Sequence, residues 1–308
     1  MKIYFDEIKP YNKLFFKSCY YNSLFAAVRY FDGDEQSIIK NNIPIYNVSK
    51  ENYMTIEYKG IRDEKEVLMD SKILVNKVNI INDIVDAIRT NLIKGRLAIV
   101  GVDIYYLPNH SEAYMKKHKT HKLLVVGFDD KEHSFFVIDQ RHIDTLSYQH
   151  CKILFEDLEK AFTYRKDSLT TVEKINYNDS CKILGENNYG YLVKSVIRER
   201  IVEYEKLLCI SKKYIDLPQN IVNIEPIIKQ INNIMHNKKN EGIICEQHKY
   251  HKEIIKHCNI AVDYWAIVRS KLLMASFEGK FEKKTYETIY VYLKKIKSEE
   301  EKFMNYFE

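Results

Sequence analysis

The spacing of apolar residues predicts two amphipathic helices in the first third of the chain. Residues 18–30 carry apolar side chains at helical intervals, with Ser18 as the candidate N-cap, so Cys19 would lie in the first helical turn. The run 80–95 repeats this spacing and ends on Gly95, as many helices do. Between the two helices, the apolar residues of the segment 53–58 predict a strand.

A β-rich region follows the second helix. Residues 96–107 form a continuous apolar, β-branched run that stops before a proline, which is the pattern of a buried strand. Two further runs, 121–130 and 133–140, flank the polar turn 129–132 and predict an antiparallel hairpin. A helical pattern at 153–164 closes this part of the chain.

Beyond about residue 178 the strand patterns end and long helical patterns replace them. They cover 189–214, 223–239, 254–277 and a terminal segment rich in Lys and Glu. We therefore divide the chain into a catalytic core at 1–165 and a mostly helical region at 166–308. This second region, which contains the single tryptophan, is expected to act as a lid or as a subdomain that binds substrate or carrier.

Composition excludes several classes of protein. The 308 residues are 45% hydrophobic and 30% charged, which is typical of a folded globular chain. The net charge of +5 is mild for a nucleic-acid binder, and the 9 glycines include no phosphate-binding motif. The N-terminus lacks the apolar region of a signal peptide and no window is apolar enough for a membrane span, so we expect a cytoplasmic protein with no membrane or nucleic-acid partner.

Three residues form a candidate nucleophilic site. Cys19 opens a helix, where free backbone N–H groups lower the pKa of a thiol. His121 begins one strand of the predicted hairpin and Asp139 ends the other, so the hairpin brings imidazole and carboxylate together. Each residue also has a plain structural interpretation, as a core cysteine, a structural histidine or a turn aspartate. Their order along the chain is that of papain-like enzymes.

The motifs around this site resemble a known family. The run Gly95–Gln140 contains V-D-I-Y-Y-L-P, then a tyrosine and two histidines before a strand, then G-F-D-D and a final aspartate, with the cysteine helix upstream. It resembles the N-terminal domain family of butirosin biosynthesis protein H over about the first 165 residues. The resemblance implies an α+β, papain-like cysteine protease fold with a central antiparallel sheet, here followed by a largely helical C-terminal extension.

The family resemblance also implies an activity. Its members transfer an acyl chain from the phosphopantetheine arm of an acyl or peptidyl carrier protein to the enzyme cysteine, and then to a small amine, in antibiotic biosynthesis. Mapped onto this chain, Cys19 resembles the nucleophile, His121 the general base and Asp139 the residue that orients the base. No cofactor of its own is implied, because the carrier supplies the phosphopantetheine.

Two positions depart from the expected pattern. Lys13 stands where a papain-type enzyme has its oxyanion glutamine, so the oxyanion contact would come from the Cys19 backbone N–H and a second donor, Asn22 or Tyr20. Gln140 stands where many relatives have proline, and we expect it to alter only the exit of the strand.

Further residues are candidates for substrate binding. Asp103 is the best candidate to contact a cationic amine, although a hydrogen bond within a turn explains it equally well. The neighbouring segment and loop add the remaining pocket candidates, which are Tyr105, Tyr106, Tyr114 and His118. A basic rim around His121, formed by Lys116, Lys117, Lys119 and Lys122, would attract an acidic carrier protein. A second basic cluster, Lys294, Lys295 and Lys297, is a weaker candidate.

A metal site is disfavoured by the sequence. His110, His118 and His121 have no Cys or Glu at a supporting interval, and the six cysteines form no C-x-x-C pair. Two alternatives to acyl transfer stay open: a cysteine peptidase or thioesterase that passes the acyl group to water, and a binding module that keeps the fold without the chemistry.

Overall fold

The computed structural model divides the chain into two compact units. Unit 1 comprises 1–41 and 62–182, and unit 2 comprises 42–61 and 183–308. The segment 42–61, which the sequence pattern assigns to the core at 1–165, therefore lies in unit 2. The structure describes residues 1–78, 81–142, 145–165, 169–175, 187–216, 224–247 and 252–306.

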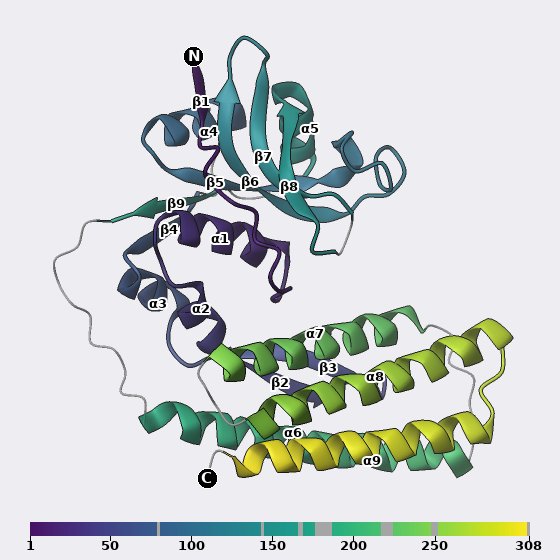
Figure 1. The fold of residues 1–308 in the computed structure, drawn as a ribbon. Helices are drawn as coiled ribbons and strands as arrows, with labels where there is room; N and C mark the ends of the chain where they lie inside the picture. Colours follow the sequence, from purple (N-terminus) through teal and green to yellow (C-terminus); the bar gives the residue numbers. More distant parts are fainter. Residues whose placement is uncertain are drawn as a thin grey trace. The chain divides into compact units, whose positions relative to one another are not determined.

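Unit 1 contains the central antiparallel sheet that the family resemblance implied (Figure 1). The strands follow the order β4-β9-β5-β6-β7-β8, and β1 pairs with β6. Their bounds are β1 (Lys2–Tyr4), β4 (Ile73–Val78), β5 (Leu97–Asp103), β6 (Thr120–Asp129), β7 (Ser134–Gln140), β8 (Tyr148–Leu154) and β9 (Leu169–Lys174). Every residue of β5 and β7 is buried, as their continuous apolar runs predict.

Helices cover both faces of this sheet. α1 (Cys19–Tyr30) packs against β5, β6 and β9. α4 (Ile84–Ile93) and α5 (Phe155–Arg165) pack against each other and against β5. The shorter helices are α2 (Glu35–Lys40), α3 (Glu64–Asp70) and a 3₁₀ turn at Ile104–Tyr106. The helix predicted at 18–30 and the hairpin of β6 and β7 are both confirmed.

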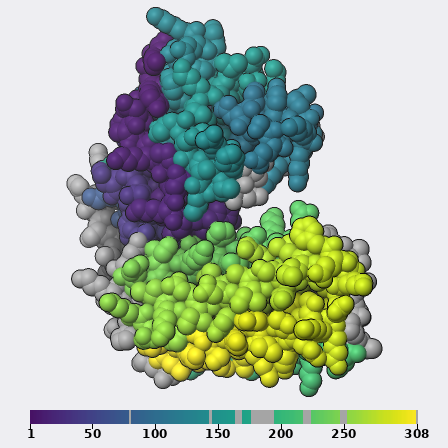
Figure 2. Space-filling view, turned by 45° about the vertical axis from the view of Figure 1, so that its right-hand side comes forward, coloured from purple at the N-terminus to yellow at the C-terminus, as the bar shows by residue number. Residues whose placement is uncertain are grey.

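Unit 2 is a helical bundle with a two-stranded hairpin. Its helices are α6 (Asn187–Asp216), α7 (Glu225–Gln247), α8 (Lys252–Glu278) and α9 (Lys283–Asn305), and its strands are β2 (Asn42–Val48) and β3 (Met54–Gly60). α8 packs against α7 and α9, while β2 packs on α6 and β3 on α7. The green and yellow surface in Figure 2 belongs to these C-terminal helices. Among the helices that the structure describes, none is both apolar and long enough to cross a bilayer.

Candidate active site

The start of α1 places Cys19 at the first residue of a helix. Ser18 takes the N-cap position with extended backbone, but its hydroxyl makes no cap hydrogen bond. The N–H groups of the first turn are therefore not satisfied by a side-chain cap, and the positive end of the helix dipole lies at the thiol. Cys19 is partly exposed.

His121 and Asp139 form a buried pair on the hairpin of β6 and β7. The hairpin pairs Leu124 with Ile138 across the two strands, so the start of β6 lies beside the end of β7. The His121 Nε2–H donates to the Asp139 Oδ1 over 2.6 Å, and both side chains are at most 3% exposed. This is the juxtaposition that the hairpin pattern predicts.

The thiol of Cys19 is hydrogen-bonded to the imidazole of His121. Burial alone would raise the pKa of Cys19, but the hydrogen bond and charge of His121, with the backbone N–H of Lys122, lower it overall. Because the Nε2 of His121 is engaged by Asp139, Nδ1 is the ring nitrogen left for the thiol. Burial likewise opposes a charged His121, yet Asp139 and then Cys19 raise the pKa of His121 above its ordinary value.

A second histidine, His110, completes the buried cluster. Its Nε2–H donates to the Asp139 Oδ2 over 2.8 Å, and the residue is 2% exposed. Its Nδ1 is buried and has no hydrogen-bond partner among the residues that the structure describes, so a proton there would be unsatisfied. We therefore place the His110 ring proton on Nε2. From the sequence, His110 is a candidate only for metal binding, and the one signal for its contact with Asp139 is that it is a histidine in the family segment.

Three donors fix the carboxylate of Asp139. Besides the two imidazoles, the backbone N–H of Gln140 donates to Oδ1 over 2.7 Å. Burial by itself would raise the pKa of Asp139, but the charge of His121 and the hydrogen bonds from both histidines hold it well below its ordinary range. Asp139 is thus a carboxylate kept ionised in the core of unit 1.

Gln140 does more than alter the exit of the strand. Its side chain is buried, and its Nε2 lies 3.5 Å from the Nδ1 of His121. The expectation that the change from proline affects only the strand exit is therefore wrong. The Gln140 amide therefore lies beside Nδ1 of His121, the same ring nitrogen that is left for the Cys19 thiol.

His110, His121 and Asp139 are also the one set of three potential metal ligands found among the described residues. Their bonding atoms are 2.6 and 2.8 Å apart, which are hydrogen-bond distances. Ligands at 2.0–2.1 Å from a tetrahedral zinc lie about 3.3 Å from each other. The three side chains are of types that bind metal ions, but in this arrangement their ligand atoms hydrogen-bond to one another. His118, the third histidine that the sequence offers as a metal ligand, is hydrogen-bonded to Asp103 instead.

Asp103 is occupied by its own loop. Its Oδ1 accepts the backbone N–H groups of Tyr105 and Lys119, and its Oδ2 bonds to the Nδ1 of His118 over 2.8 Å. The register pairs Asp103 with Thr120, one residue before His121, so the Asp103 and His121 side chains leave the sheet on opposite faces. A contact from Asp103 to an amine at Cys19 is therefore not supported, and the turn interpretation holds.

The remaining pocket candidates fall into two groups. Asn22 is buried and donates both amide hydrogens to the carbonyls of Tyr11 and Leu14, so it has no donor left for an oxyanion. That expectation is corrected. The aromatic candidates lie on or near the 3₁₀ turn, where Tyr105 stacks on His118 with ring centres 4.1 Å apart. The other aromatic candidates are Tyr106, 5.0 Å from the Tyr105 ring, and Tyr114, which is exposed.

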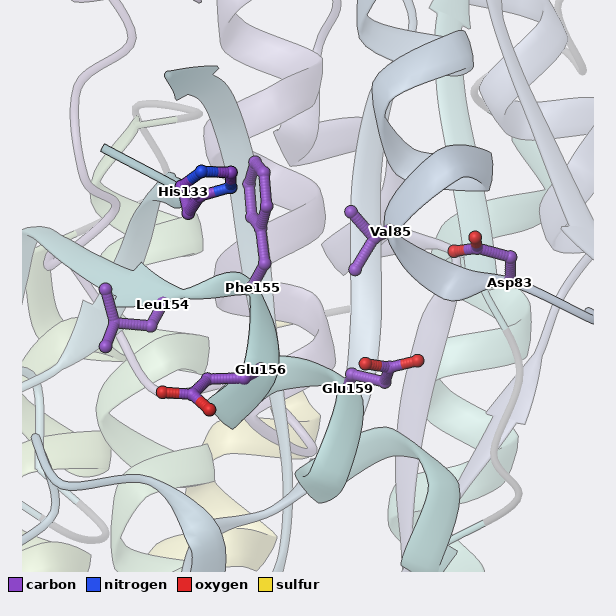
Figure 3. Close-up of a pocket in the computed structure, with 7 residues that line it drawn as sticks. All are labelled: Asp83, Val85, His133, Leu154, Phe155, Glu156 and Glu159. Carbon is purple, nitrogen blue, oxygen red and sulfur yellow. The ribbon is translucent and has the colours of Figure 1, made fainter. Parts of the chain in front are cut away.

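A surface pocket of unit 1 lies at the other end of the hairpin. Figure 3 shows the ring of His133, from the β6–β7 turn, beside Phe155, and the carboxylates of Glu156 and Glu159 along the same hollow. Because His121 starts β6 and Asp139 ends β7, this pocket is remote from Cys19 along the strands. None of the described residues that line it is a cysteine, serine or threonine.

Comparison with known proteins places the buried cluster in a family. No curated protein matches the chain significantly. A family model described as butirosin biosynthesis protein H, N-terminal, matches residues 53–140, a segment that contains His110, His121 and Asp139 but not Cys19. The family resemblance seen in the sequence is thus confirmed for the segment that carries the histidines and the carboxylate: residues 53–140 match the model of the N-terminal family of butirosin biosynthesis protein H.

Proposed function

We propose that the chain is a cysteine-dependent acyltransferase that forms amides. It takes an acyl group from the phosphopantetheine thioester of an acyl or peptidyl carrier protein and passes it through Cys19 to a small amine. The observation that carries the proposal is the hydrogen bond between a partly exposed thiol of lowered pKa and an imidazole anchored by a buried carboxylate. The matched family supports the coarser part, a biosynthetic enzyme of the acyltransferase type.

The first step is a thioester exchange. The Cys19 thiolate attacks the carbonyl carbon of the carrier thioester, and the resulting tetrahedral intermediate expels the pantetheine sulfur, which takes the proton of His121. One thioester replaces another, so the exchange is close to thermoneutral and needs no ATP. The helix N-terminus supplies backbone N–H groups for the oxyanion.

The second step forms the amide. The amine nitrogen attacks the acyl-Cys19 carbonyl, His121 accepts the amine proton through Nδ1, and the Cys19 thiolate leaves. The charge on His121 is balanced by Asp139 throughout, because Nε2 keeps its bond to the carboxylate. His110 acts through Asp139 as a positioning residue, since its Nε2–H holds the second carboxylate oxygen.

Surface charge and composition extend the proposal to the carrier protein and to the pathway. An acyl carrier protein is acidic, and the loop before β6 carries Lys116 and Lys117, both exposed. We propose that this rim attracts the carrier in the cytoplasm. The chain's Tyr-rich, Ile/Lys/Asn-rich composition also resembles the amide-forming enzyme of closthioamide biosynthesis, which joins carrier-bound chains to a diamine. A thioamide-type antibiotic pathway is the finer form of the proposal.

The test uses an octanoyl-loaded acyl carrier protein with and without 1,3-diaminopropane. We expect intact-mass analysis to find an octanoyl adduct on the full chain, and N-(3-aminopropyl)octanamide only when the amine is present. Cys19→Ala should give neither, whereas Cys209→Ala, which removes an exposed thiol, should behave as the wild type. Rapid octanoate release without amine would favour a thioesterase or peptidase, and an adduct that survives Cys19→Ala would refute the nucleophile.

A further inference from the structure

Gln140 contacts both Asp139 and His121 and has no part in the two steps proposed above. Its backbone N–H donates to the Asp139 Oδ1 over 2.7 Å, and its side-chain Nε2 lies 3.5 Å from the Nδ1 of His121. Asp139 bonds to the Nε2 of the same ring, so two consecutive residues at the end of β7 hold its two nitrogens. Gln140 is 6% exposed, and a buried amide costs free energy unless it is hydrogen-bonded.

The two steps of acyl transfer need opposite forms of His121. In the first step Nδ1 gives a proton to the leaving sulfur, whereas in the second step Nδ1 must present a lone pair to the proton of the amine. Burial opposes the charged ring, but Asp139 and then Cys19 raise the pKa of His121 to about 10. A ring that stayed protonated at neutral pH could not serve as the base of the second step.

The Gln140 amide favours the neutral form of the ring. An amide N–H donates to a lone pair, so its contact with Nδ1 stabilises the neutral imidazole of His121 and disfavours a proton there. The contact is long for an N–H···N hydrogen bond, and the Cys19 thiol shares the same nitrogen. Once the sulfur is acylated, it has neither a proton nor a charge to offer Nδ1, and the amide remains beside that nitrogen.

We propose that Gln140 is a positioning residue that holds the Nδ1 of His121 as the proton acceptor for the amine in the second step. The inference rests on the proposed acyl transfer and adds to it a group that acts after acyl-Cys19 has formed. The amine nitrogen attacks the carbonyl carbon, its proton passes to Nδ1 in place of the amide contact, and the Cys19 thiolate leaves. Asp139 thus favours the form of the ring that the first step needs, and Gln140 favours the form that the second step needs.

The other neighbours of His121 leave Nδ1 to the thiol and the amide. Outside the triad, His110 is the titratable group that we find against the ring in the described part of the chain, with ring centres 5.3 Å apart, and it bonds to the carboxylate. β5 places the apolar Val102 opposite His121, and Lys122 leaves β6 on the other face. β1 pairs with the far end of β6, and Arg89 of α4 bonds near that end. A change to the amide therefore alters one neighbour of Nδ1.

The first test uses the full chain without an acyl donor. Gln140→Met removes the amide but keeps the length of the side chain and the backbone N–H to Asp139. Gln149→Met, at an exposed position of β8 opposite Asp139, is the matched control. Because the lost donor stabilised neutral His121, the pKa of that ring should rise, which ¹⁵N NMR would detect. Alkylation of Cys19 by iodoacetamide should then persist to a pH about half a unit lower than in the wild type, the size that one weak hydrogen bond gives.

The second test follows the acyl-enzyme. The chain is acylated with the N-acetylcysteamine thioester of octanoic acid, and 1,3-diaminopropane is then added over a range of pH. Aminolysis rises as Nδ1 loses its proton, so we expect its midpoint to move up by about half a pH unit in Gln140→Met, which lowers the rate below the midpoint about threefold. Gln140→Glu, whose carboxylate accepts from the imidazolium, should move it by about one unit or more. Gln149→Met should leave it unchanged, and a loss of packing alone would lower the rate without moving the midpoint.

Two results would overturn the proposal. One is a folded Gln140→Met variant whose alkylation and aminolysis midpoints coincide with those of the wild type. The other is alkylation of this variant that shifts to higher pH, which would mean that the amide presents its oxygen to the ring. If the methionine variant does not fold, Gln140→Glu, which keeps the shape of the side chain, carries the aminolysis comparison. A wild type that takes up no octanoyl group would refute acyl transfer, whereas amide formation with unshifted variants would refute the role of Gln140 alone.

Discussion

Each unit of this protein buries a cluster of ionisable side chains, and the two clusters differ in how completely they are paired. In unit 1, two imidazoles share one carboxylate, and one of them also faces a partly exposed thiol. In unit 2, Arg200 and Lys238 meet Glu241 and Glu300 in the middle of the bundle. Both clusters lie in cores, but only the first faces a partly exposed thiol.

The cluster of unit 2 is balanced by its own members. Lys238 Nζ lies 2.6 Å from Glu241 and 2.8 Å from Glu300, and Arg200 lies 2.6 Å from Glu241. Burial alone would lower the pKa of Lys238, yet the two glutamates raise it above its ordinary value. Two positive groups face two negative ones, so the charges compensate within the core.

The comparison shows that buried charge by itself does not mark an active site. A closed, balanced network gives a substrate nothing to react with, and it serves the packing of the bundle. The cluster of unit 1 changes its charge distribution when the proton moves between Cys19 and His121, and Asp139 compensates that change. The combination of a partly exposed thiol and a buried imidazole distinguishes it.

The largest effect should come from Asp139→Asn. The asparagine has one acceptor oxygen where two imidazoles now donate, so its amide group faces an N–H and forces a tautomer change in one ring. We expect acyl transfer to fall by about 10²–10⁴-fold, as for other triad carboxylates. Single-turnover acyl-Cys19 formation would measure it. The urea midpoint serves as the folding control, and full activity in a folded variant would remove Asp139 from the site.

Lys238→Met tests the balanced cluster in the same way. It leaves two buried glutamates with one cation, so we expect the free energy of unfolding of unit 2 to fall by about 3–5 kcal/mol. Trp265 fluorescence in urea reports this unit directly, because the residue lies in its core. Lys256→Met, at an exposed pair with Glu253, is the control and should change stability by less than about 1 kcal/mol. An equal loss of stability in the two variants would mean that the buried network contributes no more to folding than a surface ion pair.

The sequence could predict the parts of the site that depend on local pattern. Ser18 before an apolar helical run places Cys19 at a helix start, and the two apolar runs around 129–132 fix the hairpin that joins His121 to Asp139. These inferences need only periodicity and turn chemistry. The helices of unit 2 follow from their long amphipathic patterns in the same way.

The parts that could not be predicted depend on contacts between residues that are far apart in the sequence. His110 reaches Asp139 because the loop before β6 folds back, and nothing in its local sequence fixes that path. β9 pairs with β4 across some ninety residues, although its Thr170 and Thr171 give a weak strand pattern. The inward orientation of the Asn22 amide and the transfer of the β2–β3 hairpin to unit 2 are likewise tertiary choices.

A smaller effect concerns the pH dependence of alkylation at Cys19. The lowered pKa of Cys19 and the raised pKa of His121 both favour a thiolate beside an imidazolium, so the thiolate should persist to lower pH than that of an ordinary cysteine. Alkylation by iodoacetamide should therefore persist to lower pH at Cys19 than at Cys209, and peptide mapping would give both rates in one sample. Burial raises the pKa of Cys151 and of Cys245 to about 12, so these thiols should stay unreactive. A Cys19 profile that coincides with that of Cys209 would contradict the ion pair.

The smallest effect is expected at His110, and it separates positioning from bulk packing. His110→Gln keeps an N–H donor for the Asp139 Oδ2, whereas His110→Leu removes it. Because the His110 bond helps to hold the pKa of Asp139 low, the leucine variant should shift the acid limb of acyl transfer to higher pH and lower kcat about tenfold. His142→Leu, at an exposed pair with Glu112, is the surface control. Rescue by glutamine of both the acid limb and kcat is the signature of positioning, since a role in packing alone would leave the pH profile of the leucine variant unchanged.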